Sequence, residues 1–176
     1  GSEIAVREAT YNAAGDPATT RKQLEALRAS GVNMLFPDYP QPYWFYDLCD
    51  EKGLVIWAEI PYITMHMKNG RANTLTQMEE LIRQNYNHPC IAVWDLSNEI
   101  TAASAVNEDL LENHRLLNEL AHKLDPTRKT TMANVFMLGI DSPILEIPDV
   151  NSYNLYFGWY LGELEQNDCL LYTSPS

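Results

Sequence analysis

The sequence predicts an α/β protein in which parallel strands alternate with amphipathic helices. Short apolar runs of strand length recur along the chain, and segments with helical periodicity separate them. The runs are nearly continuous in apolar residues, as in strands covered on both faces. Strands and helices that alternate pair in parallel through right-handed crossovers, so a (β/α) barrel and an open doubly wound sheet both fit. No GxGxxG or Walker loop follows a strand, which argues against the open sheet.

The first elements have clear boundary signals. A segment around Ile4 to Val6 is a candidate first strand. Asp16 is followed by a proline, which predicts the start of a helix, and Gly31 predicts its end. The apolar run 32–36 then has the length of a strand and predicts the next one.

The middle of the chain repeats this order. Pro42 predicts the start of a second helix, Gly53 its end, and residues 54–60 the strand that follows. Thr76 and Glu79 have the spacing of a capping box. We therefore expect the next helix to begin at Thr76.

The last elements complete the alternation. Residues 91–96 predict another strand, and the longest helix should begin near Asn107 and end at Asp125, before a proline. Residues 130–136 and 149–156 predict two more strands. Five or six parallel strands are expected in total.

Composition excludes several kinds of partner. The 176 residues include 12 Lys and Arg against 24 Asp and Glu, a net charge of −12 that repels nucleic-acid phosphates and anionic membranes. No apolar run approaches the roughly 20 residues that cross a bilayer. Three scattered cysteines, Cys49, Cys90 and Cys169, argue against a disulfide framework. We expect a cytoplasmic protein with no nucleic-acid or membrane partner, and the oligomeric state stays open.

Polar residues gather at the carboxyl ends of the predicted strands. They are Asp38, Tyr39, Glu59, Asn98, Glu99, Tyr153 and Tyr156. In both candidate architectures these ends meet at the active site, and carboxylates, an amide and phenols suit a polyhydroxylated ligand. The alternative is that strand ends lead into loops, which are polar whatever they do.

Longer motifs favour an active site over ordinary polar loops. Residues 87–99, NHPCIAVWDLSNE, resemble the acid/base strand of glycoside hydrolase family 2, which has Asn-His-Pro, an apolar strand with Trp, and Asn-Glu. Residues 45–62 and 122–134 resemble the segments on either side of that strand. Residues 149–160, DVNSYNLYFGWY, are similar to the family's Asn-x-Tyr-x-Gly-Trp-Tyr element. The similarity looks closest to bacterial β-galactosidases, with β-glucuronidases next.

The resemblance runs from about Gly31 to Gln166 and implies a fold and domain boundaries. It implies a partial (β/α)8 TIM barrel with about five or six of the eight strands present. Residues 1–168 are then an incomplete catalytic domain. Residues 169–176 do not resemble the family and have the character of an artefactual tail.

The resemblance also implies a reaction and site residues. Members cleave β-glycosidic bonds by a two-carboxylate double displacement. Glu99 corresponds to the acid/base, Asn98 to the residue that binds the sugar 2-hydroxyl, and Tyr156 to the active-site tyrosine, with Tyr153 as its alternative. The strand end that carries the family's nucleophile has no counterpart in the sequence, so we expect this chain alone to be inactive.

Two further positions depart from the family pattern. Asp38 stands where members have a histidine facing the sugar, and Phe36 where they have an arginine, so Asp38 is expected to bind substrate in an altered subsite. His66 matches a loop histidine on the substrate side that helps members hold magnesium. The accompanying loop glutamate is missing, so we expect no cofactor, with Mg²⁺ near Glu99 and His66 as the alternative. Glu59 is expected to be a structural carboxylate paired within the barrel.

Three functions therefore remain at this stage. The first is a retaining glycosidase acting on β-galactosides or related carbohydrates. The second is a catalytically inactive, sugar-binding relative, which the altered segment 33–42 favours. The third is an unrelated barrel such as a lyase or aldolase, and a buried lysine at a strand end would favour it, but the sequence has none there.

Overall fold

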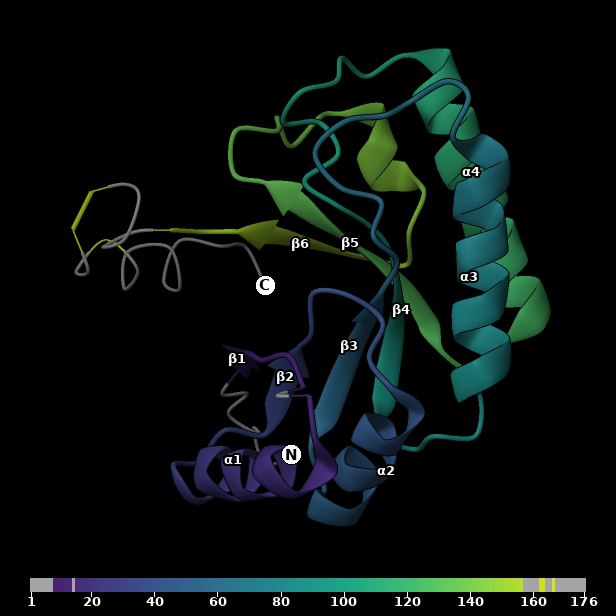
Figure 1. The fold of residues 1–176 in the computed structure, drawn as a ribbon. Helices are drawn as coiled ribbons and strands as arrows, with labels where there is room; N and C mark the ends of the chain where they lie inside the picture. Colours follow the sequence, from purple (N-terminus) through teal and green to yellow (C-terminus); the bar gives the residue numbers. More distant parts are fainter. Residues whose placement is uncertain (1–7, 14, 157–161, 164–165, 167–176) are drawn as a thin grey trace.

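The computed structural model describes residues 8–13, 15–156, 162–163 and 166, and its strands form one parallel sheet (Figure 1). In chain order the elements are β1 (Glu8–Thr10), α1 (Pro17–Ala29), β2 (Met34–Phe36), α2 (Tyr43–Lys52), β3 (Val55–Glu59), α3 (Arg71–Asn85), β4 (Ile91–Asn98), α4 (Glu108–Leu124), β5 (Lys129–Val135), the 3-10 helix η1 (Pro143–Glu146) and β6 (Val150–Asn154). The strands follow one another as β1-β2-β3-β4-β5-β6, and every neighbouring pair is parallel. The predicted α/β partial barrel is confirmed.

The predicted starts of two helices are confirmed by their caps. The side chain of Asp16 accepts a hydrogen bond from the backbone N–H of Thr19 at 2.8 Å, directly before α1. Asn107 accepts one from the N–H of Leu110 at 3.0 Å, directly before α4. Each cap satisfies a backbone donor that has no partner within its helix.

The start predicted for α3 is wrong. The helix begins at Arg71, and Thr76 lies inside it, where its hydroxyl donates to the carbonyl of Ala72 at 3.0 Å. Arg71 is held at the helix start by Asp109 of α4, to which its guanidinium donates at 2.7 Å. This tertiary contact extends the helix beyond the local capping signal. The first strand predicted at residues 4–6 and the predicted boundary at 168 lie outside the described residues.

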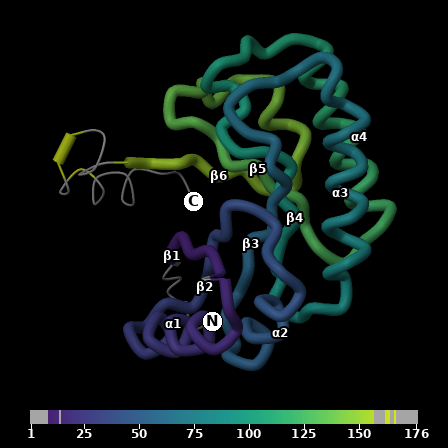
Figure 2. The backbone as a smooth tube through the Cα atoms, in the orientation of Figure 1, coloured from purple at the N-terminus to yellow at the C-terminus, as the bar shows by residue number. Residues whose placement is uncertain are grey.

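The helices cover one side of the sheet. Figure 2 shows them around the outside of its curve, with α3 and α4 side by side. Side chains alternate along the strands, so Ile56 and Ala58 of β3 are buried toward the helices while Trp57 and Glu59 point the other way. Trp94 of β4 is fully buried in the helix layer. No helix among the described residues is long and apolar enough to span a membrane.

Candidate active site

A cavity of about 520 Å³ opens where the carboxyl ends of the strands meet. Its lining includes the last residues of five strands, which are Thr10, Phe36, Glu59, Asn98 and Asn154. Asp38, Tyr153 and Tyr156 complete its polar wall. In a parallel barrel this end of the strands carries the active site, so the cavity is where a substrate is expected.

A β-bulge in β4 turns Asn98 into this cavity. Asp95 lies opposite Thr131 of β5, but Asn98, three residues on, lies opposite Ala133, so β4 has one residue more than its partner. As a result Ser97 faces α4, where its hydroxyl hydrogen-bonds Nε2 of His114 at 2.8 Å. Asn98, the next residue, lines the cavity.

Glu99 follows in a strained backbone conformation. Its φ is 48°, in the left-handed region, and its N–H donates to the carbonyl of Ala133 at 2.7 Å. Such a conformation costs on the order of 1–3 kcal/mol for a residue with a side chain, and it persists only where the surroundings impose it. Strain of this kind is concentrated at functional sites, and here it positions the carboxyl group.

Two residues of the last described strand region hold the Glu99 carboxyl group. The Tyr156 hydroxyl donates to Oε1 of Glu99 at 2.7 Å, and Nδ2 of Asn154 donates to the same oxygen at 3.0 Å. Asn154 also donates to Oδ1 of Asn98 at 3.0 Å. The structure thus brings Asn98, Glu99 and Tyr156 together, and it is Tyr156 rather than Tyr153 that contacts Glu99.

Asn154 is a site residue that the sequence interpretation missed. It is the first residue of the Asn-x-Tyr-x-Gly-Trp-Tyr element, so the motif itself contained the signal. Only the register of β6 against β5 shows that its amide reaches both members of the Asn98–Glu99 pair.

Three carboxyl groups form a cluster beside this site, with Glu59 at the end of β3, Asp38 just after β2 and Asp95 within β4. Glu59 is only 2% exposed, is paired in register with Asp95 and lies against both Asp95 and Asp38. Burial, followed by repulsion from these two carboxylates, raises the pKa of Glu59 well above its usual range. Burial also raises the pKa of Asp38, which lines the cavity as predicted. Above the cluster, Phe36 stacks on Trp57 with ring centroids 4.6 Å apart.

The structure does not bring His66 to the cavity. Its Nδ1 hydrogen-bonds the hydroxyl of Tyr62 at 2.5 Å, and its Nε2 bonds Oδ2 of Asp109 at 2.8 Å. Both ring nitrogens are therefore occupied, and the side chain is 7% exposed. The reason is the first turn of α4, because Asp109 lies there and draws the loop histidine away from the strand ends.

The contacts of His66 also show whether it could share a magnesium ion with Glu99. A site shared by Glu99 and His66 would need a free imidazole nitrogen, and the described contacts leave none. Within the described residues, Glu99 and His66 do not belong to any group of side chains close enough to share an ion. The residues present do not fit a magnesium ion at this position.

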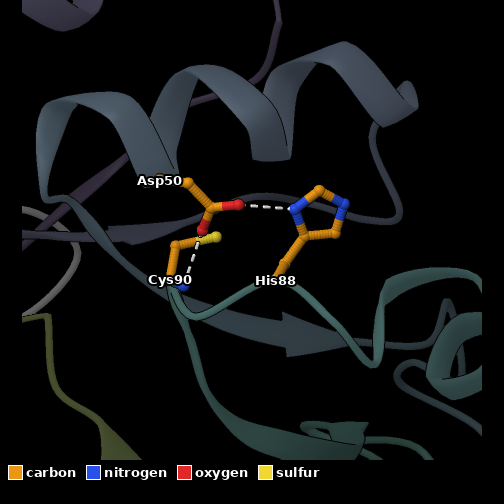
Figure 3. Close-up of side chains that lie close together, drawn as sticks. All are labelled: Asp50, His88 and Cys90. Carbon is orange, nitrogen blue, oxygen red and sulfur yellow. Dashed lines mark hydrogen bonds and ion pairs between the residues drawn. The ribbon is translucent and has the colours of Figure 1, made fainter.

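Asp50, His88 and Cys90 are the described residues whose ligand atoms do lie within 4.8 Å of one another (Figure 3). Asp50 bonds Nδ1 of His88 through one oxygen at 2.6 Å and accepts the Cys90 N–H through the other at 2.7 Å. Burial, reinforced by Asp50, raises the pKa of the Cys90 thiol, which disfavours the thiolate that a metal needs. This cluster fastens the end of α2 to the loop before β4.

Known proteins with similar sequences and structures agree on one family. The model of "Glycosyl hydrolases family 2, TIM barrel domain" matches residues 14–172. The chain is 36% identical over 154 residues to a putative beta-glucuronidase of Formosa agariphila, which covers 81% of this chain and 18% of that protein. It is 35% identical over 139 residues to a beta-galactosidase of Thermoanaerobacter pseudethanolicus, covering 76% of this chain and 17% of the relative.

Solved structures give the same result. The FMN-binding beta-glucuronidase from Facaelibacterium prausnitzii L2-6 superposes with a TM-score of 0.85 at 37% identity, covering 93% of this chain and 27% of that one. A putative beta-galactosidase from Bacteroides fragilis also gives 0.85, at 29% identity, covering 98% and 26%. The chain spans about a fifth of the length of the curated relatives it matches. It belongs to glycoside hydrolase family 2, within the TIM-barrel domain of that family.

Proposed function

We propose that this chain supplies the acid/base half of a retaining β-glycosidase site. The observation that carries the proposal is the pair of hydrogen bonds from Tyr156 and Asn154 to a single oxygen, Oε1, of Glu99. An oxygen that already accepts two hydrogen bonds has little capacity left for a proton, so the acid proton belongs on Oε2. Glu99 is thereby held with a defined proton-donating oxygen at the end of β4.

In the proposed reaction, Glu99 first acts as a general acid. It gives its proton to the glycosidic oxygen while a second carboxylate attacks the anomeric carbon, so that the aglycone leaves as an alcohol and a glycosyl–enzyme ester forms. Glu99, now a carboxylate, takes a proton from water, and the resulting hydroxide displaces the enzyme carboxylate. The attacking carboxylate is assigned to a strand beyond β6, so the 176-residue chain alone is proposed to be inactive.

Asn98 is proposed to bind the sugar. Asn154 donates to its Oδ1, which fixes the orientation of the amide. Its Nδ2 donates a long hydrogen bond of 3.5 Å to the Tyr39 hydroxyl, and the second N–H of the amide is left as a donor at the cavity wall. A hydrogen bond from this group to the 2-hydroxyl would strengthen as charge develops at the neighbouring anomeric carbon. Asp38, on the facing wall, is proposed to accept hydrogen bonds from other hydroxyl groups.

The proposed substrate is a β-galactoside. The described residues that line the cavity include no arginine or lysine, so they offer uncharged and acidic partners, which suit hydroxyl groups. A β-glucuronide is the second candidate, because several relatives at up to 36% identity carry that name. Its carboxylate would need a cation from outside this wall. A catalytically inactive, sugar-binding relative remains the alternative that the activity test decides.

The test is Glu99→Gln in a chimaera in which residues 8–156 replace the matching segment of a full-length family β-galactosidase. We expect aryl galactosides with poor leaving groups to lose about 10²–10⁴-fold in kcat, whereas those with good leaving groups lose little, because good leaving groups depart without a proton. The exposed Glu80→Gln is the matched control and should change neither rate. Equal losses for both substrate types would remove Glu99 from the acid role. Parallel assays with aryl glucuronides decide the substrate.

A further inference from the structure

Glu59 is a buried carboxyl group surrounded by other carboxyl groups. It is 2% exposed, and no N–H or O–H group of the described residues donates to either of its oxygens. The groups it does contact are the carboxyls of Asp95, its register partner on β4, and Asp38, just after β2. Carboxylates in contact cannot all be ionised, since their repulsion in a buried site is too strong.

We propose that Glu59 is a neutral carboxylic acid whose O–H donates to the Asp38 carboxylate, so that it positions Asp38 as the acceptor for sugar hydroxyl groups. This inference rests on the proposed function for its substrate, but its protonation part does not. Glu59 is a positioning residue here, because it acts through Asp38.

The surroundings of the three groups determine where the proton belongs. Burial raises the pKa of Asp95 to about 7, but hydrogen bonds that it accepts from Nε1 of Trp57 at 2.5 Å and from the N–H of Ser97 at 3.2 Å oppose that rise and favour its ionised form over that of Glu59. Asp38 lies at the cavity wall, where partial burial raises its pKa, but water still reaches its exposed side chain and stabilises its charge. Glu59 has neither kind of support. A protonated Glu59 becomes a hydrogen-bond donor between the carboxyl groups themselves, where an ionised Glu59 offers none.

A neutral Glu59 favours substrate binding because it does not repel the Asp38 carboxylate. Asp38 must stay ionised and in one orientation to accept hydrogen bonds from a sugar, and an ionised Glu59 behind it would repel it. A hydrogen bond from an acid to a carboxylate is charge-assisted and stronger than one between neutral groups. The stacked rings of Phe36 and Trp57 lie beside the cluster and keep the local dielectric low.

The pH dependence of folding stability follows from the groups that face Glu59. They are Asp95 on β4 and Asp38 with Tyr39 after β2. None is a cation, so nothing among the described neighbours compensates a negative charge on Glu59. The folded state binds a proton at Glu59 that the unfolded chain releases above its ordinary pKa of about 4.3. Folding stability should therefore decrease as pH rises from there toward the raised pKa of the folded state.

The first test compares wild type with Glu59→Gln in the 176-residue chain. Urea unfolding is followed by tryptophan fluorescence at submicromolar concentration between about pH 5 and pH 9. Glutamine has the size and neutrality of protonated glutamate. We expect the folded-to-unfolded ratio of wild type to fall by up to about tenfold per pH unit relative to Glu59→Gln. Glu80→Gln, an exposed carboxyl on α3, should follow wild type at every pH.

The second test measures methyl β-galactoside binding by fluorescence, since Trp57 lies beside the cluster. Burial and the neighbouring carboxylates raise the pKa of Glu59 to about 9, so about half of the wild-type molecules carry an ionised Glu59 at pH 9. We expect Glu59→Gln to bind like wild type at pH 6 and to keep its affinity toward pH 9, where wild type weakens about twofold. Glu59→Leu, which removes the donor, should weaken binding tenfold at both pH values.

Each result has a separate meaning. Parallel unfolding curves for wild type and Glu59→Gln would overturn the neutral acid. A wild-type pH profile of binding that matches Glu59→Gln, or unchanged binding by Glu59→Leu, would overturn the positioning role while leaving the glycosidase proposal intact. If wild type binds no galactoside, the positioning role fails together with the proposed substrate, whereas the unfolding comparison still decides the protonation.

Discussion

At the scale of single residues, His114 holds the end of β4, where the candidate active site lies. It is fully buried on α4, its Nε2 bonds the Ser97 hydroxyl at 2.8 Å, and its Nδ1 lies 3.0 Å from the carbonyl of Leu110. Ser97 directly precedes Asn98, so this contact fixes the bulge that turns Asn98 into the cavity. Burial lowers the pKa of His114 to about 4.

This pKa predicts an acid-sensitive fold. The unfolded chain binds a proton at His114 below its usual pKa of about 6.5, whereas the folded state does not until about pH 4. Stability from this group is complete above about pH 6.5 and should fall by up to about 3 kcal/mol as pH drops to about 4. His114→Gln should abolish that part of the slope in urea unfolding. His122→Gln changes a half-exposed histidine near the end of the same helix, which contacts Asp149 and not Ser97. It is the control and should retain the slope.

The same scale shows which site residues sequence alone can identify. Asn98 and Glu99 are adjacent in the chain, and a contiguous motif locates them. His66 could not be placed this way, because its partner Asp109 is 43 residues further along and belongs to another element. Asn154 lay within a motif, yet its two contacts depend on how β6 is aligned with β5.

At the scale of elements, the cap of one helix and an internal residue of another predict different losses of stability. Asn107→Ala should lower the free energy of unfolding by about 1 kcal/mol, because it leaves the N–H of Leu110 without its cap at the start of α4. Thr76→Ala should change it by less than about 0.5 kcal/mol, since Thr76 lies within α3 and bonds only its own helix. Urea unfolding at one pH measures both. A loss at Thr76 equal to that at Asn107 would contradict the position assigned to the helix start.

The elements also show why most of the fold could be predicted. The ends of α1 and α2 are predictable from sequence because a glycine follows each helix. Gly31 and Gly53 adopt positive φ angles of 94° and 63°, which glycine accommodates at no steric cost. The start of α3 was not clear, because Arg71 is held by Asp109, a contact between helices that no local pattern contains. The bulge in β4 was also hidden, since it is defined only relative to β5.

At the scale of the whole molecule, the sheet of described strands has two edge strands, β1 and β6. In the part of the chain that the structure describes, β1 and β6 each pair with one neighbour only, so their outer edges have no strand beside them. An unpaired edge presents backbone N–H and C=O groups that another chain can bind. Val150 at the start of β6 is 43% exposed and adds an apolar side chain to that edge.

We therefore expect the 176-residue chain to self-associate as its concentration rises from submicromolar to tens of micromolar. Light scattering should show a mean mass above that of one chain. Val150→Lys should lower it, because a charged side chain on an edge strand opposes strand addition. Val55→Lys is the matched control, since Val55 is also exposed, at 37%, but lies on β3, which is paired on both sides. A single mass at every concentration, or equal effects of the two lysines, would show that the edge of β6 is already protected.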